Sequence, residues 1–479
     1  MKNKINKILV SAAIAAAVSC PAMAQYQVTD YGTKLEEAPQ DKYAVKLTDK
    51  NNCGYSIDRP GEFLTQKAID RRKKWNIDIT ELDLPVNMKY VDSLRALGFK
   101  IHGISKWLNC VVVECDKDMI EKLNNLSFVD TNYEWRRKSD SHEKAAQIKR
   151  PKKLKGPDMT DKHVYNYGDG QNQAKMLNIH KMHSAGFTGK DVTIAVLDAG
   201  FYHANELPSF TKLFSDGRVL GVRDFVDGDT SVYDADTHGM MVLSCITANW
   251  SGKFVGTAPD ASVYLFRTED ADTENIVEEY NFACAAEVAD SLGVDMIHAS
   301  LGYQNFDNNA TSYTREENDG NTTIASVAAD IAASRGIVIT ISAGNGGDDD
   351  SFPWVTSPSD ADSVLAVGAV DKNGELAYFS SRGLTYDGRV KPDVCAQGLW
   401  ATVQGANGRI TRSNGTSFAG PIMAGAVMCL IQAHPKAPVV EILNAVRAAG
   451  NIWDKPNGDY GYGIPDFEIA HKILRKKKY

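Results

Sequence analysis

Five short runs of almost wholly apolar residues constrain the fold of this chain more than any other feature. They cover residues 192–197, 262–266, 296–300, 336–341 and 364–370, and Gly-containing turns and helix-length segments separate them. Strands this apolar have no face for solvent, so they are typical of a parallel sheet that helices cover on both sides. Residues 161–479 are therefore predicted to form an α/β domain. In such domains, functional side chains lie at the carboxyl ends of the strands.

The region before this domain has a different, alternating pattern. Strand-like runs cover residues 43–47, 99–104, 108–114 and 128–133, and helix-like runs cover 63–75, 86–97 and 117–126. This order predicts a small α+β domain within residues 25–135, with one antiparallel sheet and helices on one face. The domain could serve the larger one or act as an independent binding module.

The N-terminus carries the pattern of a signal peptide over residues 1–24. Three lysines among the first seven residues precede an apolar stretch over residues 8–18, and Ala22-Met23-Ala24 offers a small-x-small cleavage site. The stretch is shorter than the ~20 apolar residues of a membrane helix, so a membrane anchor is the weaker alternative. We expect a product outside the cytoplasm, periplasmic or secreted, with no membrane span once the signal is removed.

Residues 136–160 are predicted to form a basic linker between the two domains. Its basic residues are Arg136, Arg137, Lys138, Lys144, Lys149, Arg150, Lys152, Lys153 and Lys155. Such a segment is solvated and open to proteases, so a maturation cut is expected there. A nucleic-acid patch is the alternative, but no aromatic residues are interleaved for base stacking. The formal net charge of -8 also argues against nucleic acid as a partner.

The cysteines do not indicate a disulfide framework or a zinc site. Removal of the signal leaves an odd number without a CxxC pair. They are Cys53, Cys110, Cys115, Cys245, Cys284, Cys395 and Cys429. We expect most of them to be buried as small hydrophobic residues.

Three polar positions adjoin apolar elements of the larger domain. Asp198 follows the run 192–197, where an unpaired buried carboxylate would be costly, although turn aspartates also occupy such positions. His238 and Gly239 directly precede an apolar helical stretch. This position suits a general base, but a structural histidine would fit it equally well.

The third position is Ser417, within Asn414-Gly415-Thr416-Ser417-Phe418-Ala419-Gly420-Pro421 at the start of an apolar helix. The helix N-terminus places the positive end of its dipole beside the hydroxyl, and small neighbours keep that hydroxyl accessible. A plain N-cap serine would explain the hydroxyl. It would not explain the glycines, small residues and proline around it.

Together these segments resemble the subtilisin-like serine peptidases, or subtilases, whose catalytic residues follow the order Asp, His, Ser. The resemblance implies a catalytic triad of Asp198, His238 and Ser417. It also extends to Ser342-Ala343-Gly344-Asn345 and implies that Asn345 donates to the oxyanion. The similar segments span roughly residues 160–467 and occur in the family's order.

The same resemblance implies a substrate cleft and an inhibitor. Ser300-Leu301-Gly302 resembles a wall of the family's cleft, so the expected substrate-binding residues are Ser300, Leu301, Gly302, Ala343 and Gly344. The smaller domain resembles the family's ferredoxin-like propeptide, which blocks the cleft. A self-inhibited proenzyme that acts on proteins or peptides is therefore expected.

The family's chemistry requires no cofactor or catalytic metal. Subtilases often bind structural calcium, and the acidic turns at residues 319–321 and 348–350 could supply oxygen ligands, although ordinary surface turns explain them as well. The short segment over residues 348–353 leaves the cleavage preference open.

Two alternatives to an active peptidase remain. One is a catalytically silent subtilase fold used for binding or regulation, but the presence of all four expected catalytic and oxyanion residues favours the enzyme. The other is an esterase of the α/β-hydrolase type, for which the G-x-S-x-G elbow is missing around Ser417.

Overall fold

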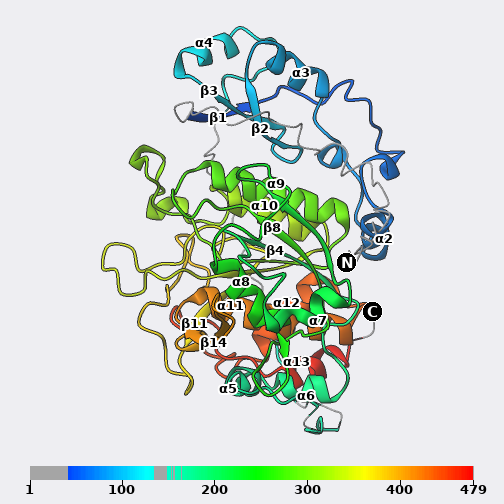
Figure 1. The fold of residues 1–479 in the computed structure, drawn as a ribbon, viewed down its shortest axis with the longest axis vertical. Coiled ribbons are helices and arrows are strands. Elements are labelled where there is room, and N and C mark those ends of the chain that lie inside the picture. The colour runs from blue at the N-terminus through cyan, green and yellow to red at the C-terminus, as the bar shows by residue number, and fades with distance from the viewer. Residues whose placement is uncertain (1–40, 134–147, 153, 155–156, 163, 478–479) are drawn as a thin grey trace, which may run out of the picture.

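The computed structural model describes residues 41–133, 148–152, 154, 157–162 and 164–477. The predicted signal peptide over residues 1–24 and much of the basic linker lie outside these residues. Figure 1 shows two units, a smaller one at the N-terminal end and a larger one that contains the rest of the chain.

The larger unit is built on a seven-stranded parallel sheet with the order β12-β11-β10-β9-β4-β8-β5. Its strands are β4 (Thr193–Asp198), β5 (Val219–Asp224), β8 (Ser262–Arg267), β9 (Met296–Ala299), β10 (Val338–Ser342), β11 (Leu365–Val370) and β12 (Val394–Gln397). The five predicted runs are all strands of this sheet, which confirms the α/β prediction. The prediction missed the two edge strands, β5, which is only partly buried, and β12.

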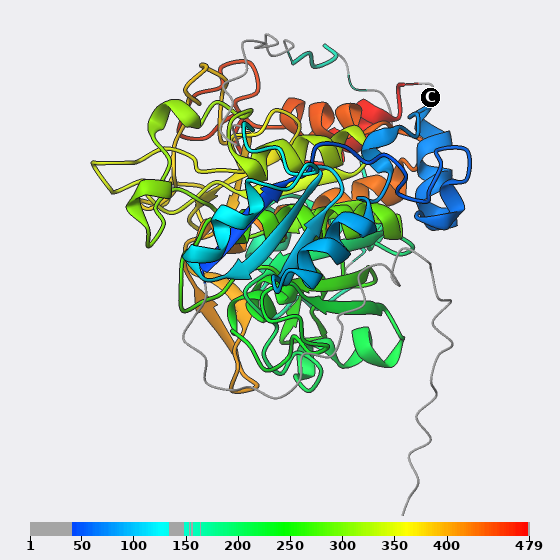
Figure 2. The same cartoon turned by 90° about the horizontal axis from the view of Figure 1, so that it is seen from above.

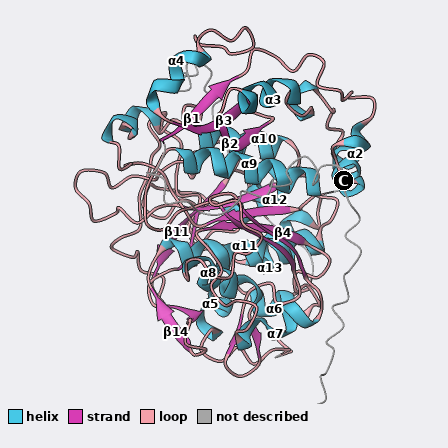
Figure 3. Ribbon diagram, turned by 45° about the horizontal axis from the view of Figure 1, so that its top comes forward, coloured by secondary structure: helices cyan, strands magenta, loops and turns pink. Residues whose placement is uncertain are grey.

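Helices cover both faces of the sheet (Figure 3). One face packs against α8 (His238–Thr247), α11 (Thr416–Ala433), α12 (Val439–Ala448) and α13 (Phe467–Leu474), with the shorter α5 (Gln171–Met176), α6 (Ile179–Ser184) and α7 (Thr211–Ser215) around them. The other face packs against α9 (Val277–Leu292) and α10 (Ile324–Ser334). Two hairpins flank these layers, β6 (Asn249–Trp250) with β7 (Phe254–Val255) and β13 (Ala401–Gln404) with β14 (Ile410–Ser413).

The central helix α11 is apolar on all sides because the core surrounds it. Its 18 residues have a mean hydropathy of 1.4, which alone would suit a membrane span, yet 78% of the helix is buried inside the molecule. It is the one helix in the described part of the chain that has this length and composition.

The smaller unit has a three-stranded antiparallel sheet with the order β1-β3-β2. Its elements are β1 (Asp41–Lys46), α2 (Gln66–Trp75), α3 (Met88–Ala96), β2 (Lys100–Ser105), β3 (Cys110–Cys115) and α4 (Ile120–Leu123). The prediction of a strand over residues 128–133 is wrong. Only Val129 pairs, in an isolated bridge to Leu47, because the backbone amide of Asn132 bonds back to Asp130 and turns the chain away.

The smaller unit lies over α9 and α10 (Figures 1 and 2). Trp107, Cys110 and Val112 face this helix layer and share its core. Cys115 faces the core of the smaller unit itself, as strand alternation requires. All seven cysteines of the described chain are free, and all but Cys53 are buried, as predicted.

The described part of the linker is less solvated than its charge pattern predicted. Ile148, Leu154 and Met159 pack against the core of the larger unit. The backbone amide of Met159 also donates to Glu468 Oε1 at 2.8 Å. The end of the linker is therefore attached to α13.

Candidate active site

A carboxylate and an imidazole meet at the carboxyl end of β4. Asp198 is the last residue of β4 and is buried, and His238 is the first residue of α8. Asp198 Oδ1 lies 2.8 Å from His238 Nδ1. Burial lowers the pKa of His238, but Asp198 and Asp236 raise it, and the net pKa lies above the ordinary value. Asp198 therefore fixes the ring orientation and stabilises the protonated imidazole.

Two glycines make this meeting sterically possible. Gly200 has a φ of +147°, and a Cβ on it would lie 2.5 Å from the backbone nitrogen of Asp236. A Cβ on Gly239 would collide with the Gly200 carbonyl and lie 2.8 Å from Asp198 Cβ. The end of β4 and the start of α8 approach this closely only because both residues lack a side chain.

The third predicted catalytic residue lies on the neighbouring helix. Ser417 is in the first turn of α11 and is 9% exposed. The next residue, Phe418, holds its ring 5.9 Å from the His238 ring, centroid to centroid. The structure therefore brings Asp198, His238 and the serine-bearing turn of α11 to one edge of the sheet. Within the described chain, no hydrogen bond is formed by Ser417 Oγ, so it can receive a reacting partner.

Asn345 faces the same turn of α11 from the loop after β10. Its side-chain Oδ1 accepts hydrogen bonds from Thr416 N at 2.8 Å and Thr416 Oγ1 at 3.0 Å. Because these bonds occupy the oxygen, the Nδ2 amide points the other way, and the residue is exposed. Asn345 is therefore oriented as a hydrogen-bond donor beside Ser417.

A buried chain of polar groups on β9 and β10 is hydrogen-bonded to the first turn of α11. His298, in the middle of β9, contacts Thr340 Oγ1 through Nδ1 at 2.9 Å and Ser300 Oγ through Nε2 at 2.8 Å. Ser300 Oγ then donates to the Ser417 carbonyl at 2.9 Å. Burial lowers the pKa of His298 to about 3, so the ring is neutral and can accept one hydrogen bond while donating the other.

Sequence reasoning missed this support. The one signal was a histidine within an otherwise apolar strand, which has to find polar partners when it is buried. The side chain of Ser300 is engaged in this chain of contacts, so its predicted role in substrate binding rests on its main chain. Ser342 Oγ similarly donates to the Thr416 carbonyl at 2.9 Å.

Two of the other predicted substrate-binding residues, Gly302 and Gly344, lie against the same threonine. A Cβ on Gly302 would collide with Thr356 Oγ1, and a Cβ on Gly344 would lie 3.2 Å from the same oxygen. Thr356 Oγ1 is buried and has no hydrogen-bond partner among the described residues. Leu301 is half-buried, and Ala343 is fully buried beside Gly344. No feature of the sequence singled out Thr356.

An acidic cavity of about 370 Å³ adjoins Leu301 and Gly302. Its carboxylates belong to Glu269, Asp270, Asp272, Glu274, Glu278 and Asp307. No lysine or arginine of the described chain lines this cavity. Burial raises the pKa of Glu278 to about 7, and burial with the nearby Asp307 and Glu279 raises the pKa of Glu274 to about 7. The cavity therefore becomes more negative as the pH rises through 7.

The carboxylates that could converge on a metal lie elsewhere. Among the described residues they are Asp224, Asp227 and Asp229. Arg267 Nη1 contacts Asp224 at 2.8 Å and Asp227 at 2.5 Å, so its single positive charge offsets one of the three negative charges. In the turn predicted to offer calcium ligands, Asp319 Oδ1 instead accepts backbone amides from Asn321 and Thr322. We assign no metal to the Asp224 cluster.

Comparison with known proteins gives matches for both units. The family model described as "Subtilase family" matches residues 189–463. The model described as "Peptidase S8 propeptide domain, Bacteroidota" matches residues 42–152 and so runs past residue 135, the predicted end of the smaller domain.

Individual relatives support the same assignment. Serine protease AprX of Bacillus subtilis (strain 168) is 30% identical over 312 residues, 59% of this chain and 66% of AprX. Subtilisin E of the same strain is 29% identical over 388 residues, 80% of this chain and 86% of subtilisin E. Subtilisin of Bacillus pumilus is 33% identical over 307 residues, 64% of this chain and 98% of the relative.

Among solved structures, MycP1 with its N-terminal propeptide removed has a TM-score of 0.51 and 24% identity, over 63% of this chain and 96% of MycP1. This similarity bears on the fold alone. It supports the predicted arrangement of a large parallel sheet between helical layers.

Proposed function

Because this chain belongs to the subtilase family and carries that family's propeptide, we propose that it is an exported serine endopeptidase that is made as a self-inhibited proenzyme. The observation that carries the proposal is the 2.8 Å contact between Asp198 and His238, at the same sheet edge as Ser417 and the oriented amide of Asn345. The predicted signal peptide over residues 1–24 supports export.

The proposed chemistry follows from these positions. His238 Nε2 takes the proton of Ser417 Oγ as that oxygen attacks the peptide carbonyl carbon. Asp198 keeps the ring in the required tautomer and stabilises its positive charge. The Asn345 Nδ2 amide and the Ser417 backbone amide donate to the developing oxyanion. His238 then gives the proton to the leaving amine, and water hydrolyses the acyl-enzyme.

Inhibition by the smaller unit is part of the proposal. This unit is attached to α9 and α10, and the chain that leaves it at Tyr133 leads into the basic linker. A cut between residues 136 and 160 would separate it from the peptidase. The chemistry requires no cofactor, and structural calcium at residues 319–321 and 348–350 stays a prediction.

The proposal is tested by following the intact mass of the purified proprotein over time, wild type beside Ser417→Ala, with a fluorophosphonate probe added to each. We expect only the wild type to lose about 130 N-terminal residues and to carry the probe on Ser417. If neither protein is processed or labelled even after an added protease has cut the linker, the chain is a catalytically silent binding protein.

A further inference from the structure

A helical arm reaches from the smaller unit to the far end of α9. The arm consists of residues 60–84 and includes α2, and it lies beside the larger unit, away from the antiparallel sheet of its own unit (Figure 1). Both the backbone amide and the hydroxyl of Thr65 donate to the Ser291 carbonyl, at 3.0 and 2.9 Å. The arm is therefore hydrogen-bonded to the C-terminal turn of α9.

Arg71 directs its whole guanidinium group at the larger unit. Its Nε donates to the Arg335 carbonyl at 3.0 Å, its Nη1 to the Val294 carbonyl at 2.6 Å, and its Nη2 to Asp290 Oδ1 at 2.5 Å. Arg71 is 7% exposed and Asp290 is fully buried. A charge that is removed from water this completely depends on its partner to remain buried.

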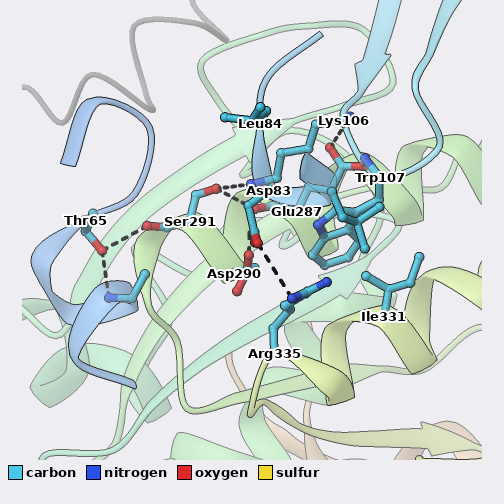
Figure 4. A network of polar contacts seen from close by, with 12 residues as sticks. Thr65, Asp83, Leu84, Lys106, Trp107, Glu287, Asp290, Ser291, Ile331 and Arg335 are labelled. Carbon is cyan, nitrogen blue, oxygen red and sulfur yellow. Dashed lines mark hydrogen bonds and ion pairs between the residues drawn. The ribbon is translucent and has the colours of Figure 1, made fainter. Parts of the chain in front are cut away.

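Arg72 approaches the same carboxylate from the other side. Its Nη1 and Nη2 lie 3.0 and 2.8 Å from the two oxygens of Asp290, and Nη2 also contacts Asp83 of the arm at 2.5 Å. Figure 4 shows Asp290 beside Asp83, and Asp83 Oδ2 also lies 3.6 Å from Arg335 Nη1. Burial raises the pKa of Asp290, but the two arginines lower it to about 2, so the carboxylate stays ionised.

The surface of the larger unit also matches the shape of the arm. Gly293 has a φ of +80°, and a Cβ on it would lie 2.6 Å from the backbone nitrogen of Ala68. Gly336 has a φ of +86°, and a Cβ on it would lie 2.8 Å from Trp75 Cδ1. Helix α2 can rest on these two turns because neither carries a side chain.

This contact lies at the amino ends of the strands, on the opposite side of the sheet from the candidate active site. Val294 and Arg335 lie in the turns just before β9 and β10, and Lys67 Nζ of the arm donates to Thr193 Oγ1 at the start of β4. The arm thus contacts the amino ends of three parallel strands, whereas Asp198 and Ser417 lie at the carboxyl ends. The arm can therefore remain bound whatever occupies the cleft.

We propose that the Asp290 end of α9 is a second docking site of the smaller unit, at which the arm slows the release of that unit once the linker has been cut. The inference rests on the proposed function, in which the smaller unit is the inhibitor. Two contacts on one rigid unit hold it more tightly than either contact alone, because the second forms at high effective concentration.

The test uses the full-length Ser417→Ala protein, with residues 139–145 replaced by the recognition sequence of an added site-specific protease. After cutting, size-exclusion chromatography at timed intervals measures how long the two fragments elute together. We expect the parent protein to retain the fragment. Arg71→Met keeps the apolar length of the side chain but leaves Asp290 with one arginine fewer, and it should release the fragment roughly 100-fold faster.

A matched control removes an arginine of the same unit that makes only an exposed pair. Arg95 contacts Asp92 at 2.9 Å on the surface of α3, so Arg95→Met should release the fragment at the parental rate. Asp290→Asn completes a double-mutant cycle with Arg71→Met, and the two effects should be non-additive because the residues share one interaction. If Asp290→Asn fails to fold, the comparison of Arg71→Met with Arg95→Met still tests whether the arm slows release of the fragment.

Two results would overturn the proposal. The first is separation of the parent fragments as soon as the linker is cut, and the second is equal release from the Arg71→Met and Arg95→Met proteins. The assay uses an inactive protein and an added protease, so its failure would leave the peptidase proposal standing. Labelling of Ser417 in the wild type tests that proposal separately.

Discussion

The carboxyl and amino ends of the parallel strands differ in how far their polar groups are hydrogen-bonded. At the carboxyl ends of the strands, Asp198 Oδ2 has no partner among the described residues, and Asn345 presents its amide to solvent. At the amino ends, both oxygens of Asp290 are bonded, and Arg71 donates through all three of its guanidinium nitrogens. A reactive site has to keep hydrogen-bonding capacity for a substrate, whereas a docking site gains affinity by pairing the charges that it buries.

The largest effect that this comparison predicts is at Ser417. Ser417→Ala should lower kcat for peptide hydrolysis roughly 10⁶-fold, because the residual rate then comes only from binding and the oxyanion donors. Hydrolysis of a fluorogenic peptide by the processed enzyme measures it. Ser413→Ala, four residues earlier in β14, is the matched control and should keep parental activity. Loss of activity in both variants would place the cause in folding.

Asn345 should contribute the next largest effect. Asn345→Ala removes one oxyanion donor, so kcat should fall about 10²- to 10³-fold while KM changes little. Thr416→Val removes only the hydroxyl that contacts Asn345 Oδ1 and leaves the Thr416 amide in place. It should therefore cost less than Asn345→Ala. Full steady-state kinetics separate the two parameters, and a rise in KM alone would show that Asn345 binds substrate without stabilising the transition state.

The acid limb of the pH profile should follow His238. A general base acts only when it is neutral, and the pKa of His238 lies above its ordinary value near 6.5. The rate should therefore rise about tenfold per pH unit at low pH and level off above a midpoint higher than 6.5. Measurement of kcat/KM across pH 5 to 9 gives the midpoint. A midpoint below 6.5 would mean that burial outweighs the attraction of Asp198.

The smallest expected effect concerns the acidic cavity beside Leu301 and Gly302. Its uncompensated charge should favour peptides with lysine or arginine upstream of the scissile bond by a few-fold over the same peptides with glutamate. Glu274 and Glu278 ionise near pH 7, so the preference should grow as the pH rises from 6 to 8. Matched peptide pairs measure it in wild type and in Glu274→Gln, and an unchanged ratio in the variant would exclude Glu274 from substrate recognition.

Local sequence was enough to predict the fold class, and the resemblance of several segments to the subtilases supplied the candidate triad. The five apolar runs have no solvent face, so they could form only a buried parallel sheet, and Asp198, His238 and Ser417 each adjoin a recognisable strand or helix. The edge strand β5 escaped prediction because its partial burial weakens the apolar pattern, and β12 at the other edge was missed as well. The predicted strand over residues 128–133 does not form because the Asp130 side chain accepts a hydrogen bond from the Asn132 amide and turns the chain there.

The sequence by itself determined which side chains are available for chemistry and the order in which they occur. Only the tertiary structure decided that His298 and Ser300 support the Ser417 turn, and that Arg71 and Arg72 surround Asp290. These contacts join residues that lie far apart in the chain. A buried polar group has to find a partner, but local sequence does not indicate which one, because that depends on how separate elements pack.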